Sequence, residues 1–202
     1  YPPRRFFQNK KCDMPKGKLF LILLFAGEAL CASAQGLRVQ FNDPHIRYSG
    51  RVAFTDTSAR LSWTATSLKI NFSGTGVRAL LADEHGDNYY NVILDGKVIS
   101  VLHPDSTKQL YTLAAGLPGR KHSLELFKRT EWAMGKTEFY YFLLDNHATE
   151  LPVPEAPKRK MEVFGNSITC GYAVEDSSGQ DRGTAPYENG YISYAAILAR
   201  HY

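Results

Sequence analysis

The feature of this sequence that most constrains its fold is a pair of apolar runs joined by Asp95-Gly96. Residues 89–94 precede the dipeptide and residues 97–102 follow it. An Asp-Gly pair between alternating apolar runs is the strongest short-range signal for a β-hairpin, because both residues accept the positive φ values of a tight turn. The chain is therefore predicted to contain two adjacent antiparallel strands at this position.

Further short apolar segments bounded by turn residues lie on both sides of this hairpin. Strands are expected at residues 61–72, 77–82, 109–113, 123–128 and 139–144. None of these segments has the periodicity of a helix. Many short strands at this spacing favour an antiparallel sandwich, and about 100 residues are enough to form one. We therefore predict an all-β sandwich over residues 36–150.

The composition of the chain changes after the predicted sandwich. Residues 151–160 hold three prolines and end in a basic run, which is typical of a stiff, solvated linker. Residues 161–164 have the pattern of a strand, and they lead into the turn Gly165-Asn166-Ser167. Residues 191–202 have the apolar spacing of a helix. Strand, turn and helix in this order predict that residues 161–202 begin an α/β domain.

The first 34 residues have the pattern of a secretory leader. Two lysines follow Met14, an apolar run occupies residues 19–26, and Ala32-Ser33-Ala34 has the form of a signal peptidase site. The apolar run is far shorter than the roughly 20 residues of a membrane span. We expect residues 1–13 to be an upstream extension and residues 14–34 to be a signal peptide. The protein would then be periplasmic or secreted.

The formal net charge of +4 arises within this leader. Residues 1–34 hold six basic and two acidic residues, which leaves 18 basic and 18 acidic residues in the remainder. The basic pI therefore gives no support for nucleic-acid binding, which requires a basic face on the folded domain. Cys170 is the single cysteine after residue 34, so the exported part cannot form an internal disulfide.

Ser167 is the clearest candidate for a catalytic residue. A serine at a sharp turn between two elements is accessible to substrate, and small neighbours let a carbonyl group approach. Its hydroxyl needs a base, usually a histidine, to accept its proton. Backbone N–H groups must stabilise the oxyanion that the attack forms, and the N–H of Ser167 is one candidate. The competing interpretation is a tight turn with a capping serine.

Residues 165–169, Gly-Asn-Ser-Ile-Thr, resemble the first motif block of SGNH (GDSL-type) hydrolases. With the following Cys170-Gly171-Tyr172, the block is most similar to that of carbohydrate esterase family 2. Further segments resemble this family in the same order, namely residues 48–51, 72–76, 92–96, 122–128 and 189–194. Because family members join a jelly-roll sandwich to an SGNH domain of flavodoxin-like α/β fold, the resemblance implies a jelly-roll-like sandwich followed by the N-terminal fragment of such a domain.

By this resemblance the protein would be a carbohydrate O-acetyl esterase whose partner is acetylated xylan- or mannan-type polysaccharide or oligosaccharide. Ser167 carries over as the nucleophile of an acyl-enzyme mechanism that needs no metal or organic cofactor. The family's oxyanion Gly and Asn and its catalytic His would lie beyond Tyr202. We therefore expect a C-terminally truncated chain that is inactive by itself. Asn166 stands where the family usually has Asp, so a negative charge is missing from this turn.

The histidines offer no clear base for Ser167. They are His45, His85, His103, His122, His147 and His201. None has a spacing that predicts pairing with Ser167, and surface or loop positions are expected for them. Asp83, Glu84, His85 and Asp87 match no calcium or zinc spacing, so we prefer a solvated loop to a metal site there.

Four aromatic residues allow a different function. Trp63, Trp132, Tyr89 and Tyr90 could stack on sugar rings, or they could pack within the sandwich. If they bind sugar, the sandwich could be a non-catalytic carbohydrate-binding module. We retain this as the alternative to the esterase function.

Overall fold

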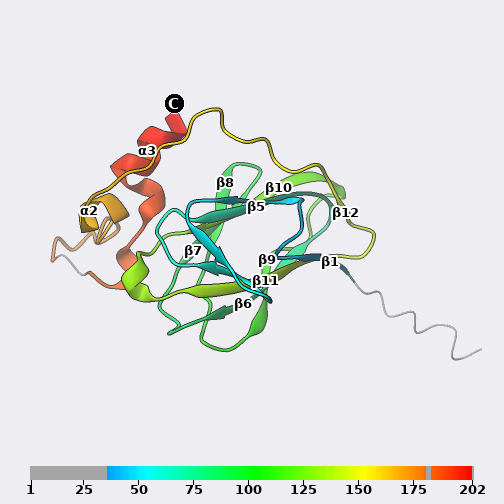
Figure 1. Cartoon of the computed structure of the whole chain (residues 1–202), viewed down its shortest axis with the longest axis horizontal. Helices are drawn as coiled ribbons and strands as arrows, with labels where there is room; N and C mark the ends of the chain where they lie inside the picture. Colours follow the sequence, from blue (N-terminus) through cyan, green and yellow to red (C-terminus); the bar gives the residue numbers. More distant parts are fainter. Residues whose placement is uncertain (1–35, 181–182, 202) are drawn as a thin grey trace, which may run out of the picture. The chain divides into compact units, whose positions relative to one another are not determined.

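Two antiparallel six-stranded sheets occupy residues 37–150 (Figure 1). The structure is a computed structural model that describes residues 36–180 and 183–201. The predicted signal peptide at 14–34 and the extension before it lie outside the described residues. Within the described part of the chain, no helix is long and apolar enough to cross a membrane.

The first sheet has the strand order β3-β4-β11-β6-β9, and β1 also pairs with β11. Its strands are β1 (Leu37–Gln40), β3 (Val52–Phe54), β4 (Ala59–Leu61), β6 (Val77–Asp83), β9 (Gln109–Ala114) and β11 (Thr137–Leu144). The second sheet has the order β12-β5-β10-β7-β8, and β2 also pairs with β5. Its strands are β2 (Ile46–Ser49), β5 (Ser67–Gly74), β7 (Tyr90–Leu94), β8 (Lys97–Leu102), β10 (Arg120–Lys128) and β12 (Thr149–Glu150).

The core lies between the two sheets. Along β6, Val77, Ala79 and Leu81 are fully buried and alternate with partly exposed residues. Ile70 and Phe72 on β5 belong to the same hydrophobic cluster. A period of two in burial is what a sheet with one covered face requires. The predicted jelly-roll-like all-β sandwich is therefore confirmed.

The Asp95-Gly96 hairpin is also confirmed. It joins β7 to β8, and Leu94 lies opposite Lys97. Asp95 has φ 50° and Gly96 has φ 80°, as expected for a two-residue turn of this kind. The carboxylate of Asp95 also accepts a hydrogen bond from the backbone N–H of Ser123 at 2.9 Å, which attaches the turn to β10.

The strand predicted at residues 161–164 is absent, so that prediction is wrong. These residues are exposed and have no regular secondary structure. An apolar run becomes a strand only when another strand supplies its hydrogen bonds, and no described strand pairs with this one.

Short helical segments follow the extended stretch. They are α2 (Ser167–Cys170), η3 (Ala185–Tyr187), η4 (Gly190–Ile192) and α3 (Tyr194–His201), and η2 (Trp132–Met134) lies earlier, between β10 and β11. The predicted helix at 191–202 is thus confirmed within α3, but it begins later because residues 190–192 form a separate 3-10 turn.

Candidate functional site

Ser167 is the first residue of the one-turn helix α2. Asn166 precedes it in an extended conformation, and its side chain accepts a hydrogen bond from the N–H of Ile168 at 3.2 Å. The helical turn ends at Gly171, which has a left-handed φ of 78°. Asn166 therefore caps α2, a role in which Asp and Asn are equivalent. The turn forms without the charge that the usual Asp would bring, and Ser167 is exposed at its start.

The backbone of this turn lies directly against residues 189–190. Asn189 donates its backbone N–H to the carbonyl of Gly171 at 3.0 Å. A Cβ at Gly171 would clash with the Asn189 carbonyl, so the close approach requires glycine. The position of the Ser167 turn thus depends on where residues 189–190 are held.

Arg129, directly after β10, holds residues 188–190 against the sandwich. Its carbonyl accepts the N–H of Gly190 at 2.8 Å, and its Nε donates to the carbonyl of Glu188 at 3.2 Å. The Arg129 guanidinium, which is almost fully buried, also forms an ion pair with Glu175. Glu175 in turn accepts a hydrogen bond from the Asn189 side chain at 2.7 Å. The sandwich therefore positions the turn that carries Ser167.

A second pair of charged groups is buried at the same junction. Glu188 accepts the backbone N–H of Glu131 at 2.8 Å, and burial raises its pKa to about 7. Burial lowers the pKa of the Lys128 ammonium to about 8. The ammonium is fully buried and donates to the carbonyls of Thr130, at 2.8 Å, and Glu131, at 3.1 Å. Glu188 therefore attaches its segment to the residues after β10, whose carbonyls Lys128 holds in place.

The structure pairs several histidines with groups other than Ser167. His122 is buried, with Nδ1 2.9 Å from Asp95 and Nε2 2.9 Å from the Pro118 carbonyl. The surface or loop position expected for it is therefore wrong, because its ring fastens the hairpin turn to β10. His103 contacts the Gly86 carbonyl at 2.6 Å.

The loop after β6 is largely solvated, as we preferred, because Glu84, His85 and Asp87 are exposed, and Asp83 is the exception. Asp83 is buried and accepts hydrogen bonds from the N–H of Gly86 at 2.8 Å and from the Asn88 side chain at 2.9 Å. Thr137 donates to the same carboxylate at 2.5 Å. Asp83 therefore organises the loop, and its two oxygens are engaged by protein donors.

The four candidate aromatic residues separate into two groups. Tyr90 is fully buried in the core, and Tyr89 stacks on the ring of His103 with centroids 4.1 Å apart. Trp63 and Trp132 are 46% and 62% exposed, with ring centroids 6.4 Å apart. Of the four, only the two tryptophans are largely exposed, although the guanidinium of Arg51 lies 5.7 Å from the centroid of the Trp63 ring.

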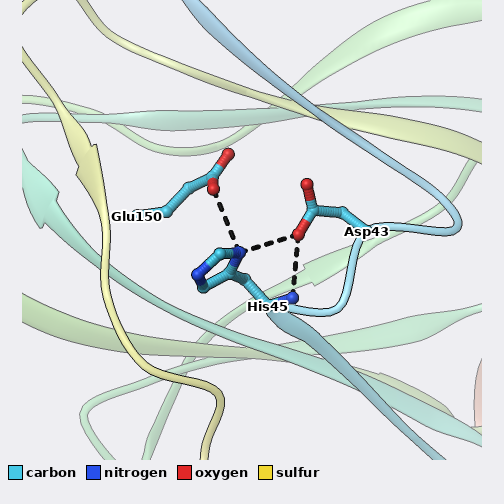
Figure 2. A group of neighbouring side chains, drawn as sticks. All are labelled: Asp43, His45 and Glu150. Carbon is cyan, nitrogen blue, oxygen red and sulfur yellow. Dashed lines mark hydrogen bonds and ion pairs between the residues drawn. The ribbon is translucent and has the colours of Figure 1, made fainter.

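A cluster that the sequence analysis did not identify joins Asp43, His45 and Glu150 (Figure 2). Nδ1 of His45 lies 2.8 Å from Asp43 Oδ1 and 3.1 Å from Glu150 Oε2. Asp43 and His45 are two residues apart, but Glu150 is remote in sequence, so spacing gave no signal for the set. Among the described residues this group has ligand atoms close enough to hold a metal ion.

The described chain is a two-sheet sandwich followed by a capped turn that carries Ser167. The profile described as carbohydrate esterase 2 N-terminal matches residues 48–154. This match covers more than half of the chain. The chain therefore belongs to the carbohydrate esterase 2 N-terminal family.

Two curated relatives agree with this assignment. The cellulase/esterase CelE of Acetivibrio thermocellus is 34% identical over 161 residues, which cover 79% of this chain and 20% of that protein. An acetylxylan esterase / glucomannan deacetylase of Cellvibrio japonicus is 28% identical over 191 residues, which cover 90% of this chain and 53% of that protein. The chain thus spans about half or less of the length of these relatives.

Two solved structures have the same fold. A family two carbohydrate esterase from Cellvibrio japonicus superposes with a TM-score of 0.76 at 26% identity, covering 82% of this chain and 49% of that one. A family two carbohydrate esterase from Clostridium thermocellum, in complex with cellohexaose, gives 0.74 at 34% identity, covering 77% and 48%.

Proposed function

We propose that this chain is the sandwich and the nucleophile-bearing segment of a serine carbohydrate O-acetyl esterase of SGNH type. The observation that carries the proposal is the exposed Ser167 at the start of a capped helical turn, within a chain of this family. Its substrate would be acetylated xylan- or mannan-type polysaccharide, since one relative is named an acetylxylan esterase / glucomannan deacetylase.

In this mechanism Ser167 Oγ attacks the carbonyl carbon of the acetyl ester while a histidine base accepts its proton. The C–O bond of the tetrahedral intermediate then breaks, and the leaving sugar oxygen takes the proton from the histidine to become a hydroxyl. Water then hydrolyses the acyl-enzyme and releases acetate. The N–H of Ser167 lies in the first turn of α2, where backbone N–H groups lack intrahelical partners, so it can donate to the oxyanion.

The histidine base and the remaining oxyanion donors are expected outside the residues described here. The described bonds of His45, His103 and His122 go to groups other than Ser167. We therefore propose that residues 1–202 alone do not hydrolyse acetyl esters. Ser167-dependent turnover by this chain alone would contradict that statement.

The test is acetyl-ester hydrolysis by the full-length protein that carries this sequence. Ser167→Ala should lower kcat/KM on acetylated xylan by at least about 10³-fold, as for other serine nucleophiles. Ser178→Ala is the matched control, because Ser178 is exposed and its hydroxyl bonds to Asp176 in a surface turn. Equal activity of Ser167→Ala and Ser178→Ala would exclude Ser167 as the nucleophile.

A non-catalytic carbohydrate-binding function is the second candidate, and the exposed Trp63–Trp132 pair favours it. If this function holds, a Trp63→Ala/Trp132→Ala variant should lose binding of cellohexaose, while the full-length protein shows no turnover. Turnover that Ser167→Ala abolishes would exclude a purely binding role.

We also propose that residues 14–34 direct export and are removed. Sequencing the N-terminus of the protein recovered from the periplasm or medium should then give Gln35 as the first residue. A mature protein that retains residues before Ala34 would contradict this cleavage site.

A further inference from the structure

The cluster of Asp43, His45 and Glu150 lies at a junction in the second sheet, away from the Ser167 turn. β2 and β12 both pair with the edge of β5 that faces away from β10. Ile46 of β2 lies opposite Ile70, and Glu150 of β12 lies opposite Phe72. The two short strands therefore meet nearly end to end along β5, with His45 and Glu150 at the meeting point.

The three side chains direct their ligand atoms at one small volume (Figure 2). Each offers one ligand atom, and these atoms all lie within 4.8 Å of one another. Asp43 Oδ1 also accepts the backbone N–H of His45 at 2.8 Å, which fixes the orientation of this carboxylate. The side chains of Asp43 and Glu150 are 25% and 20% exposed, so an ion can enter from solvent but is partly shielded once bound.

Two carboxylates so close together require a compensating positive charge. A neutral imidazole offers at most one N–H at Nδ1, which cannot satisfy both carboxylates fully. A divalent cation bound to all three groups leaves the site neutral and satisfies each ligand.

We propose that Asp43, His45 and Glu150 bind one divalent transition-metal ion of the zinc class, which ties β2 to β12. One imidazole nitrogen with two carboxylate oxygens suits such ions, whereas calcium and magnesium prefer oxygen ligands alone. Tetrahedral ligands about 2.1 Å from a zinc ion are about 3.4 Å apart. The observed separations of 2.8 and 3.1 Å are those of hydrogen bonds, so the ligand atoms would move apart by a few tenths of an ångström as the ion replaces the proton between them.

The consequence of binding is stabilisation of the sandwich. The ion would join a strand near the beginning of the sandwich to its last strand, directly before the extended residues 151–166. Since an unfolded chain does not hold these ligands together, zinc would favour the folded state by mass action.

The experiment is a calorimetric titration of the full chain, produced without a histidine tag, with ZnCl₂. We compare wild type with Asp43→Asn and Glu150→Gln, which keep the shape of the side chain, and with His45→Gln, which removes the imidazole. His85→Gln is the matched control, because His85 Nε2 lies 3.8 Å from a single carboxylate, that of Glu84. Wild type and control should bind one equivalent more zinc than the site variants, or bind it at least about tenfold more tightly. Zinc should raise Tm in wild type and control alone.

A measurement on the wild type does not depend on the folding of any variant. On addition of zinc, the His45 ring resonances should shift and its Nδ1 proton should be displaced, while those of His85 stay unchanged. Zinc uptake that is identical in wild type and all three site variants would overturn the proposal. So would a His45 ring that keeps protons on both nitrogens in excess zinc at neutral pH, because the cluster would then be a histidinium held by two carboxylates.

Discussion

Glu188 shows how a single buried carboxylate links the Ser167 segment to the sandwich. It is 1% exposed, and one of its oxygens accepts the N–H of Glu131 while the other has no protein partner among the described residues. Burial raises its pKa to about 7 from an ordinary value of 4.5. Because the pKa is higher in the folded state, protonation of this carboxyl favours folding. Its contribution to the free energy of unfolding is fully present below pH 4.5 and is lost as the pH rises through 7.

Glu188→Gln should change the stability of the protein in a pH-dependent way. The amide keeps the acceptor for Glu131 but cannot ionise. Between pH 4.5 and 7, wild type should lose stability relative to the variant, by at most about 3 kcal/mol. Urea denaturation at several pH values measures this difference. Glu155→Gln, at an exposed linker position, should show no such trend, and a pH-independent difference for Glu188→Gln would refute the prediction.

At the scale of elements, the β7–β8 hairpin depends on the backbone of Gly96. Its φ is 80°, and a Cβ built there would meet nothing within 4 Å. Substitution therefore tests backbone conformation without any change in packing. Asp95 and His122 hold the other side of the turn through their hydrogen bond of 2.9 Å.

We expect Gly96→Ala to destabilise the protein by about 1 kcal/mol, because an L-residue is strained in the left-handed region. Gly119→Ala is the control, since a Cβ there also meets open space but the backbone is outside that region. Its effect should stay within about 0.5 kcal/mol. Chemical denaturation curves measure both, and equal effects would mean that left-handed strain does not limit the hairpin.

At the scale of the whole molecule, the sandwich holds the segment that carries Ser167 through contacts with residues 188–190. Gly190 lies at the closest point of contact. A Cβ there would clash with Thr64 Cγ2 and lie 3.1 Å from the Arg129 carbonyl. The N–H of Gly190 donates to that same carbonyl at 2.8 Å.

Gly190→Ala should therefore loosen the segment while leaving the sandwich folded. Overpacking of this kind costs about 1–3 kcal/mol, so amide exchange of residue 190 should become about 5- to 150-fold faster. Amides of β5 and β10 should exchange as in wild type. Gly119→Ala provides the comparison, because a Cβ at Gly119 meets nothing within 4 Å and its backbone is outside the left-handed region. Faster exchange throughout the sandwich in Gly190→Ala would show that segment and sandwich unfold together.

Strands in the middle of the sandwich could be predicted because their signals are local. β6 alternates buried and partly exposed residues over its whole length, and Asp95-Gly96 marks the following hairpin. β1, β2 and β12 were not predicted, because each has four residues or fewer and forms by pairing with a strand far away in sequence. Residues 161–164 show the opposite error. Their apolar pattern predicts a strand, but no described strand lies beside them to supply its hydrogen bonds.

The sequence by itself determined the sandwich class, the hairpin and the turn at Ser167, because each depends on residues a few positions apart. The tertiary structure alone decided that Arg129 holds Glu175 and Glu188, and that Glu150 meets Asp43 and His45. These contacts depend on strand register and on the closure of long loops. No local pattern encodes either of them, because a shift of one residue in register would turn the same side chains to the opposite face.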